Sequence, residues 1–317
     1  MFWSRKKDTT PRGIPLNDLL LCLEPTTIKA RIEGDVLVAK HENYTTRIEV
    51  YSPEPNCIQL DPIKAVVKIK TELPAQIVRG LNLAKPDSVA MLNSFAALGA
   101  LCYENGNAYI GSRLTIYGAE DAAWKSLHLP FLLFTTILGA EAQLGGLRRA
   151  LSKEPVRGGR SAWSEDDFAP VVALLSRSSV CTSGGLGVTA EFPLKPGETT
   201  AAFGSQSTAL FQLIGDQPHP EVGGGLFSLL QLPHNINEEN RLIQVCAHLN
   251  KSEMEAKDLP PHFGAWCPSN TGNRLAYVSY FGNPFHKIPR VAVNIAIWAQ
   301  HRAEWASRQL GAIGVPL

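Results

Sequence analysis

Two stretches decide the fold: "GALCYENGNAYIGSRLTIYG" at residues 99–118 and "GAWCPSNTGNRLAYVSYFGN" at residues 264–283. Both begin Gly-Ala-X-Cys, pass through an Asn/Gly turn, and close on an aromatic–Gly pair. Asn and Gly tolerate the positive φ that a tight hairpin needs, so each stretch predicts two antiparallel strands joined by a turn. The recurrence 165 residues apart predicts a duplicated fold.

The segments around these hairpins follow the same order in both halves. Periodicity and turn residues predict, in the first half, helix 16–23, strands on both sides of Gly34–Asp35, strands in "TTRIEVYS" and "AVVKIKTEL", helix 87–98, and a long helix 120–151 interrupted at Pro130. The second half predicts a helix after Ser164, strands near 187–193, 199–214 and 226–232, helix 237–250, and helix 287–310. The expected fold is therefore α+β, with two similar lobes of order α-βββ-α-ββ-α, each an antiparallel sheet flanked by helices.

A polar, glycine-rich segment without periodicity separates the halves, "SKEPVRGGRSAW" at 152–163. We expect residues 1–14 to form a flexible tail, 15–151 the first lobe, 152–163 a linker, and 164–317 the second lobe. Duplication within one chain predicts a pseudo-dimer.

Composition excludes several function classes. The 317 residues are 44% hydrophobic and 19% charged with a net charge of +1, which gives no field that would attract nucleic acid or an anionic membrane. The most apolar stretch, 127–140, is shorter than the roughly 20 residues that span a bilayer. The basic start precedes no apolar run, which argues against a secretory signal. Six cysteines without CxxC pairs indicate reduced thiols, so a cytoplasmic location is expected.

The element order resembles the type III secretion chaperone-like fold, which class I secretion chaperones share with YbjN-type sensory-regulator domains. The resemblance covers nearly the whole chain as two copies and rests on element order. It implies a bacterial protein that binds other proteins without catalytic residues. Class I chaperones pair as homodimers, so the resemblance implies either a monomeric pseudo-dimer or a homodimer. Such chaperones are small and acidic, whereas this chain is long and nearly neutral.

The stretch "DLPPHFGAWC", residues 258–267, is the most unusual in the chain. Its two prolines stiffen the backbone ahead of one titratable and two aromatic side chains. One interpretation is a rigid, partly exposed recognition edge for a protein partner, because exposed aromatic residues suit interfaces. The other is that the aromatic residues fill the second core. The candidate binding residues are Phe263, Trp266, His262 and Asp258.

No catalytic motif is recognisable: the glycine-rich runs lack a P-loop ending, and GxSxG, HExxH and EF-hand spacings do not occur. We therefore expect no catalytic residues, cofactor or metal, and interpret Cys102 and Cys267 as buried thiols. The alternative for the second cysteine is a zinc site formed by Cys246, His248, His262 and Cys267.

The expected function is a non-enzymatic, cytoplasmic protein-binding or chaperone-like module. It would bury an apolar segment of its partner at a sheet edge or between the lobes. The alternative is an enzyme or small-ligand-binding protein with its site in the inter-lobe cleft. That alternative rests on Asp258, His262 and His286, and requires these three side chains to cluster in one closed pocket.

Overall fold

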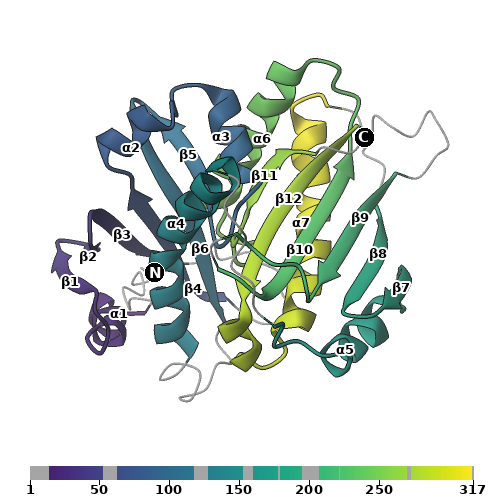
Figure 1. Ribbon diagram of the computed structural model, residues 1–317, viewed down its shortest axis with the longest axis horizontal. Coiled ribbons are helices and arrows are strands. Elements are labelled where there is room, and N and C mark those ends of the chain that lie inside the picture. Colours follow the sequence, from purple (N-terminus) through teal and green to yellow (C-terminus); the bar gives the residue numbers. More distant parts are fainter. Residues whose placement is uncertain are drawn as a thin grey trace, which may run out of the picture.

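Two six-stranded antiparallel sheets, each flanked by helices, make up the computed structural model (Figure 1). The structure describes residues 14–52, 63–117, 128–152, 160–177, 179–194, 207–220, 222–269 and 273–315. The first lobe contains α1 (Leu16–Leu23), β1 (Lys29–Glu33), β2 (Val36–His41), β3 (Tyr44–Tyr51), β4 (Ile63–Glu72), α2 (Ala75–Gly80), α3 (Pro86–Asn93), β5 (Ala100–Glu104), β6 (Asn107–Tyr117) and α4 (Leu129–Ser152). The second lobe contains α5 (Glu165–Leu175), β7 (Val180–Gly184), β8 (Gly187–Pro193), β9 (Thr208–Ile214), β10 (Gly225–Pro233), α6 (Glu239–Glu255), β11 (Ala265–Pro268), β12 (Arg274–Gly282), the 3₁₀ helix η2 (Asn283–Lys287) and α7 (Val291–Ala312).

The two sheets have the same topology, which confirms the predicted α+β fold of two similar lobes. Their strand orders are β1-β2-β3-β4-β6-β5 and β7-β8-β9-β10-β12-β11. Each lobe has four strands before its middle helical segment, whereas the general order α-βββ-α-ββ-α had three; all four segments were predicted in the first half, and β7 was not predicted in the second. The register corresponds as well: Cys102 is the third residue of β5 and pairs with Tyr109, and Cys267 is the third residue of β11 and pairs with Ala276. Equivalent positions can therefore be assigned across both sheets.

Local chemistry explains where the strands and helices begin. Asn105 and Gly106 both have positive φ, as a two-residue hairpin turn requires. Ser164 and Asp167 form a capping box at the start of α5. Pro130 lies in the first turn of α4, where its missing N–H leaves no helical hydrogen bond unmade. The short helix α2 was not predicted.

The repeated Gly-Ala-X-Cys has a packing cause. A Cβ on Gly99 would lie 2.5 Å from Ser112 Oγ, and a Cβ on Gly264 would lie 2.3 Å from the Val278 carbonyl oxygen. Both distances are too short for any side chain, so glycine is required at the start of each strand. Ala100 and Ala265, the next residues, are fully buried in one small cluster at the contact between the lobes.

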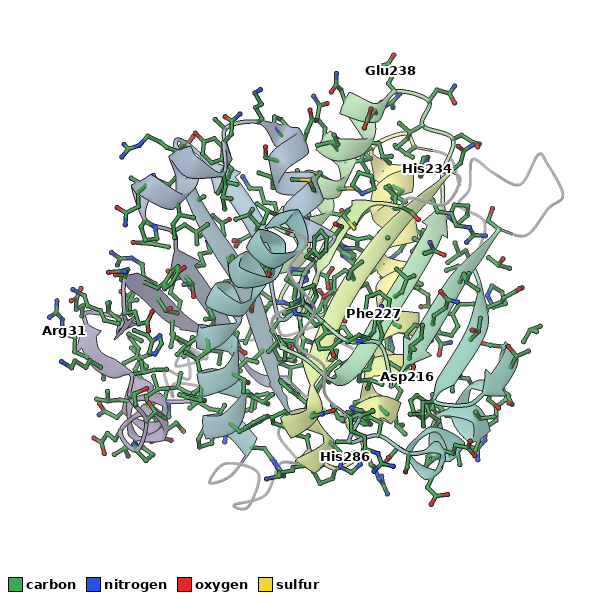
Figure 2. All side chains as sticks on the ribbon, in the orientation of Figure 1. Arg31, Asp216, Phe227, His234, Glu238 and His286 are labelled. Carbon is green, nitrogen blue, oxygen red and sulfur yellow. The ribbon has the colours of Figure 1, made fainter. Side chains whose placement is uncertain are left out.

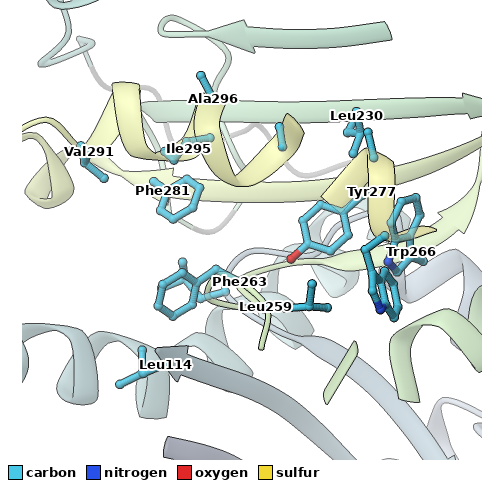
Figure 3. Close-up of a cluster of buried hydrophobic side chains, with 14 of the residues drawn as sticks. Leu114, Leu230, Leu259, Phe263, Trp266, Tyr277, Phe281, Val291, Ile295 and Ala296 are labelled. Carbon is cyan, nitrogen blue, oxygen red and sulfur yellow. The ribbon is translucent and has the colours of Figure 1, made fainter. Parts of the chain in front are cut away.

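One face of each sheet is covered by its own helices. Helices α1 and α4 pack on the first sheet, and α5 and α7 pack on the second. In Figure 1, α4 lies in front of the first sheet and α7 behind the second. The apolar residues under these helices form one continuous core that passes from lobe to lobe through Leu114, Leu259 and Phe263 (Figure 3).

The lobes contact each other with approximate two-fold symmetry. The backbone N–H of Arg113 in β6 donates to the His262 carbonyl at 3.2 Å. At the equivalent positions, the N–H of Tyr280 in β12 donates to the Ala97 carbonyl at 3.0 Å. A contact exchanged in this way is the signature of an isologous dimer interface, here within one chain.

Several expectations lie outside the described residues: most of the tail, the start of the helix at 120–151, most of the linker, the first part of strand 199–214, the turn at 270–272, and Cys57. In the remainder, no helix is both long and apolar enough to cross a membrane.

Candidate functional site

The stretch Asp258–Cys267 lies between the two lobes. Trp266 and His262 are 0% exposed and Phe263 is 3% exposed, whereas Asp258 is exposed. Phe263 packs against Phe281 and Trp298, and Trp266 packs against Tyr277 (Figure 3). The aromatic residues therefore fill the core, and the structure does not present them to solvent as a recognition edge would require.

Two arginines hold the backbone of this stretch. Arg113 of the first lobe donates from its two Nη atoms to the carbonyls of Ala256 at 2.7 Å, Leu259 at 3.2 Å and Pro260 at 2.6 Å. Arg302, from α7 of the second lobe, donates to the Pro261 carbonyl at 2.6 Å. Buried carbonyls need donors, so the guanidinium groups are what allow this segment to be buried between the lobes.

Glu253 at the end of α6 is the buried anion that pairs with Arg302. Its carboxylate accepts hydrogen bonds from Arg302 Nε at 2.7 Å and from Trp266 Nε1 at 2.9 Å, and His262 Nδ1 lies 3.2 Å away. The Arg302 guanidinium also stacks on the Tyr277 ring, 4.0 Å from its centroid. We call these five residues, Glu253, Arg302, His262, Trp266 and Tyr277, the buried network.

The charges in the network are set by burial and by each other. Burial would raise the pKa of Glu253, but Arg302, His262 and Arg113 together outweigh burial and hold that pKa well below its usual range. Burial is the main cause that lowers the pKa of His262, and together with the two arginines it outweighs the raising effect of Glu253. Burial lowers the pKa of Arg113 to about 10, which leaves it protonated at neutral pH. His262 is therefore neutral at pH 7, and Glu253 with Arg302 forms the ion pair.

The three residues of the enzyme hypothesis do not form one pocket. His262 is enclosed in the buried network, whereas Asp258 is exposed. His286 lies at the opposite end of the second lobe from α6 (Figure 2), where its Nε2 is 3.1 Å from Asp167 Oδ1 at the start of α5. Its ring packs edge-on against Trp163. Asp167 also accepts a hydrogen bond from the Ser164 hydroxyl at 2.9 Å, so this arrangement fixes the start of α5.

The cysteines are placed as buried thiols. Burial raises the pKa of Cys102 and of Cys267 to about 12, so both are protonated and unreactive near neutral pH. Of the proposed zinc ligands, His262 is bonded within the buried network and His248 is exposed on α6 beside Ser252. Across the described ranges, no group of three or more His, Cys, Asp or Glu residues is arranged to hold a metal ion.

A pair of equivalent asparagines was missed by sequence reasoning. Asn93 at the end of α3 bonds both the N–H and the carbonyl of Leu101 in β5, at 2.7 and 3.0 Å. Asn250 in α6 makes the same two bonds to Trp266 in β11, at 2.7 and 2.9 Å. These amides hydrogen-bond to the edge strands β5 and β11, where the lobes meet. A cavity of about 290 Å³ lies between the two asparagines. The spacing differs, 8 against 16 residues, so the sequence does not display the correspondence.

The face of each sheet turned away from its own covering helices, here called the second face, differs sharply between the lobes. Three rows of paired residues cross it in each sheet. In the first lobe these rows are Lys29–Lys40–Thr45–Glu72–Tyr109, Arg31–Val38–Arg47–Lys70–Gly111 and Glu33–Val36–Glu49–Lys68–Arg113. In the second lobe they are Val180–Glu191–Leu210–Gln231–Ala276, Thr182–Thr189–Gln212–Leu229–Val278 and Gly184–Gly187–Ile214–Phe227–Tyr280. Ten of the fifteen first-lobe positions are Lys, Arg or Glu; in the second lobe only Glu191 is.

Comparison of the chain with protein-family models, with curated proteins and with solved structures finds no match. The interpretation of function therefore rests on the geometry.

The neutral state of His262 predicts a pH dependence of stability. The unfolded chain binds a proton at His262 below its usual pKa of 6.5, and the folded chain resists doing so because that pKa is lowered. Stability from this group is therefore full above pH 6.5 and falls as the pH drops, by at most about 1.4 kcal/mol per pH unit. We expect urea unfolding between pH 7.5 and 5 to show this slope, and His262→Gln to reduce it. His301→Gln, on the exposed surface of α7, is the matched control. An unchanged slope in His262→Gln would contradict the assignment.

Proposed function

We propose that this protein is a non-enzymatic, cytoplasmic protein-binding module, and that β7 with the adjoining second face binds an extended, uncharged segment of a partner. The proposal rests on a difference in charge between the two lobes, which share one topology. Positions that are charged on the second face of the first lobe are mostly uncharged in the second lobe. The resemblance to chaperone-like folds supports it, as do the buried, protonated thiols, which suit a reducing compartment.

The two outer edge strands differ in the way that decides strand addition. Strand β1, "KARIE", carries three charged residues, and charges on an edge discourage pairing with another chain. Strand β7, "VCTSG", carries none, and Val180 is 69% exposed. Figure 2 places Arg31 of β1 at the outer edge of the first lobe. The charged side chains of β1 would therefore disfavour pairing with an added strand, whereas β7 has no charged side chain to prevent it.

The side chains of Val180 and Thr182 on β7 would contact such a strand directly, and the apolar face continues beyond them. Leu210, Ile214, Phe227 and Leu229 are half-buried there and project away from α7, and Figure 2 shows Phe227 on the front of the second sheet. Phe227 and Leu229 pack on the small cluster formed by Cys267, Ala276 and Val278. A partner segment with apolar or β-branched residues at alternate positions would extend this face, while its backbone pairs with β7.

Site-specific photo-cross-linking in the native host tests the proposal. A photoreactive p-benzoylphenylalanine replaces Val180 in β7, or its equivalent Lys29 in β1 as the matched control. We expect a discrete protein adduct from position 180 and none from position 29. Mass spectrometry of the adduct should place the cross-link in an uncharged extended segment. Thr182→Lys, which copies the charge of Arg31 onto β7, should reduce the adduct at least fivefold.

Two results would overturn the proposal. Equal adducts from positions 180 and 29 would mean non-specific contact, and no adduct from position 180 would mean that β7 is not used. A cross-linked segment rich in charged residues would refute the stated chemistry of the partner.

A further inference from the structure

The cavity between the lobes has walls from both of them. Helix α3 and strand β5 of the first lobe form one side, and α6 with Trp266 of the second lobe forms the other. Its volume is about 290 Å³. For scale, an apolar cavity of about 150 Å³ is enough to bind benzene, so this one has room for about two rings.

The floor of the cavity is uncharged, and its polar groups are already bonded. Asn93 and Asn250 bond to backbone groups of β5 and β11, and the Trp266 indole N–H donates to Glu253. Cys102 and Cys246 add two protonated thiols, because burial raises the pKa of each. An ionised ligand group placed here would lose its hydration without gaining an opposite charge, which costs several kcal/mol.

Charged groups occur only at the mouth. Lys251 Nζ lies 2.9 Å from Glu104 Oε1 across the boundary between the lobes, so these two charges already satisfy each other. Ala247 and His248 of α6 are exposed beside them, and Ala84 is exposed at the facing rim. The opening is therefore bordered by residues that can be enlarged without disturbing the core.

We propose that this cavity binds a small, uncharged, mainly apolar molecule of about the size of a fused two-ring aromatic compound. Such a ligand would contact both lobes at once, through Val89 and Cys102 on one side and Ile243 and Ala247 on the other. Burial of its apolar surface would drive binding. This site is separate from β7 and does not depend on the proposed protein-binding function.

Isothermal titration calorimetry of the full chain with 2-naphthol tests the proposal. We expect saturable one-to-one binding, and at least tenfold weaker binding of 2-naphthoate, which has the same rings with an ionised carboxylate. Ala247→Phe should block the mouth and weaken 2-naphthol binding at least tenfold. Ala312→Phe, on the exposed end of α7, is the matched control and should bind as the unmodified protein does.

Ala84→Phe narrows the same mouth from the opposite rim and repeats the test should Ala247→Phe fail to fold. Equal 2-naphthol affinity in the mouth variants and in Ala312→Phe would place binding elsewhere and overturn the proposal. Absence of binding up to the solubility limit of 2-naphthol would overturn it as well. Tighter binding of 2-naphthoate would refute the uncharged class of ligand.

Discussion

Glu253→Ala is expected to lower the free energy of unfolding by about 3–5 kcal/mol, measured by urea denaturation at pH 7. The substitution leaves the Arg302 guanidinium buried, at 5% exposure, without its carboxylate. It also removes the acceptor of the Trp266 indole N–H. A single substitution would thus leave one buried charge and one buried hydrogen-bond donor without their partner at the contact between the lobes.

The double variant Glu253→Ala/Arg302→Met separates loss of the charge pair from loss of packing. Because it removes both charges, it should be less destabilised than the sum of the two single variants. A Glu253→Ala cost below about 1 kcal/mol would show that water or another anion replaces the carboxylate, and would contradict the enclosed network.

Gly264→Ala is expected to cost about 3 kcal/mol, because its Cβ would lie 2.3 Å from the carbonyl oxygen of Val278 in the neighbouring strand β12. That oxygen is a backbone atom, so relief requires the strands to separate. The equivalent Gly99→Ala should cost less, since its nearest obstacle, Ser112 Oγ at 2.5 Å, belongs to a side chain. Urea unfolding of both variants measures the difference.

Gly80→Ala at the end of α2 is the matched control. Nothing lies within 4 Å of its added Cβ, and alanine restricts the unfolded chain more than glycine does. It should therefore be neutral or stabilising by up to about 1 kcal/mol. A Gly264→Ala variant as stable as Gly80→Ala would show that the two quoted stretches do not share glycine for steric reasons.

The fold was largely predictable because its signals are local. Asn105–Gly106 and Gly34–Asp35 specify hairpin turns, and alternating apolar and polar residues such as Ile69 and Lys70 indicate a strand. Strand β7 was not predicted because "VCTSG" is short, does not alternate clearly between apolar and polar residues, and contains few β-branched residues. The short helix α2 has no buried face to give it a periodic stripe.

The sites were less predictable because they depend on contacts between distant residues. Nothing around Arg113 indicates that it would bond to carbonyls more than 140 residues away. The charge contrast between the second faces becomes visible only when the strand registers are known. Phe263 and Trp266 were chosen as candidate binding residues because they are aromatic. Whether such residues face solvent or the core depends on packing, which the sequence does not show.

The exchanged backbone contacts of Arg113 and Tyr280 show that one chain contains what would otherwise be a symmetric dimer interface. In a dimer of identical subunits, every surface change occurs twice. An edge strand without charges would therefore occur on both subunits, and pairing at both ends would allow the protein to polymerise. Covalent linkage of the two copies removes that coupling. In a single chain, the edge strand of one lobe can therefore carry charges, as β1 does, while the equivalent strand β7 carries none.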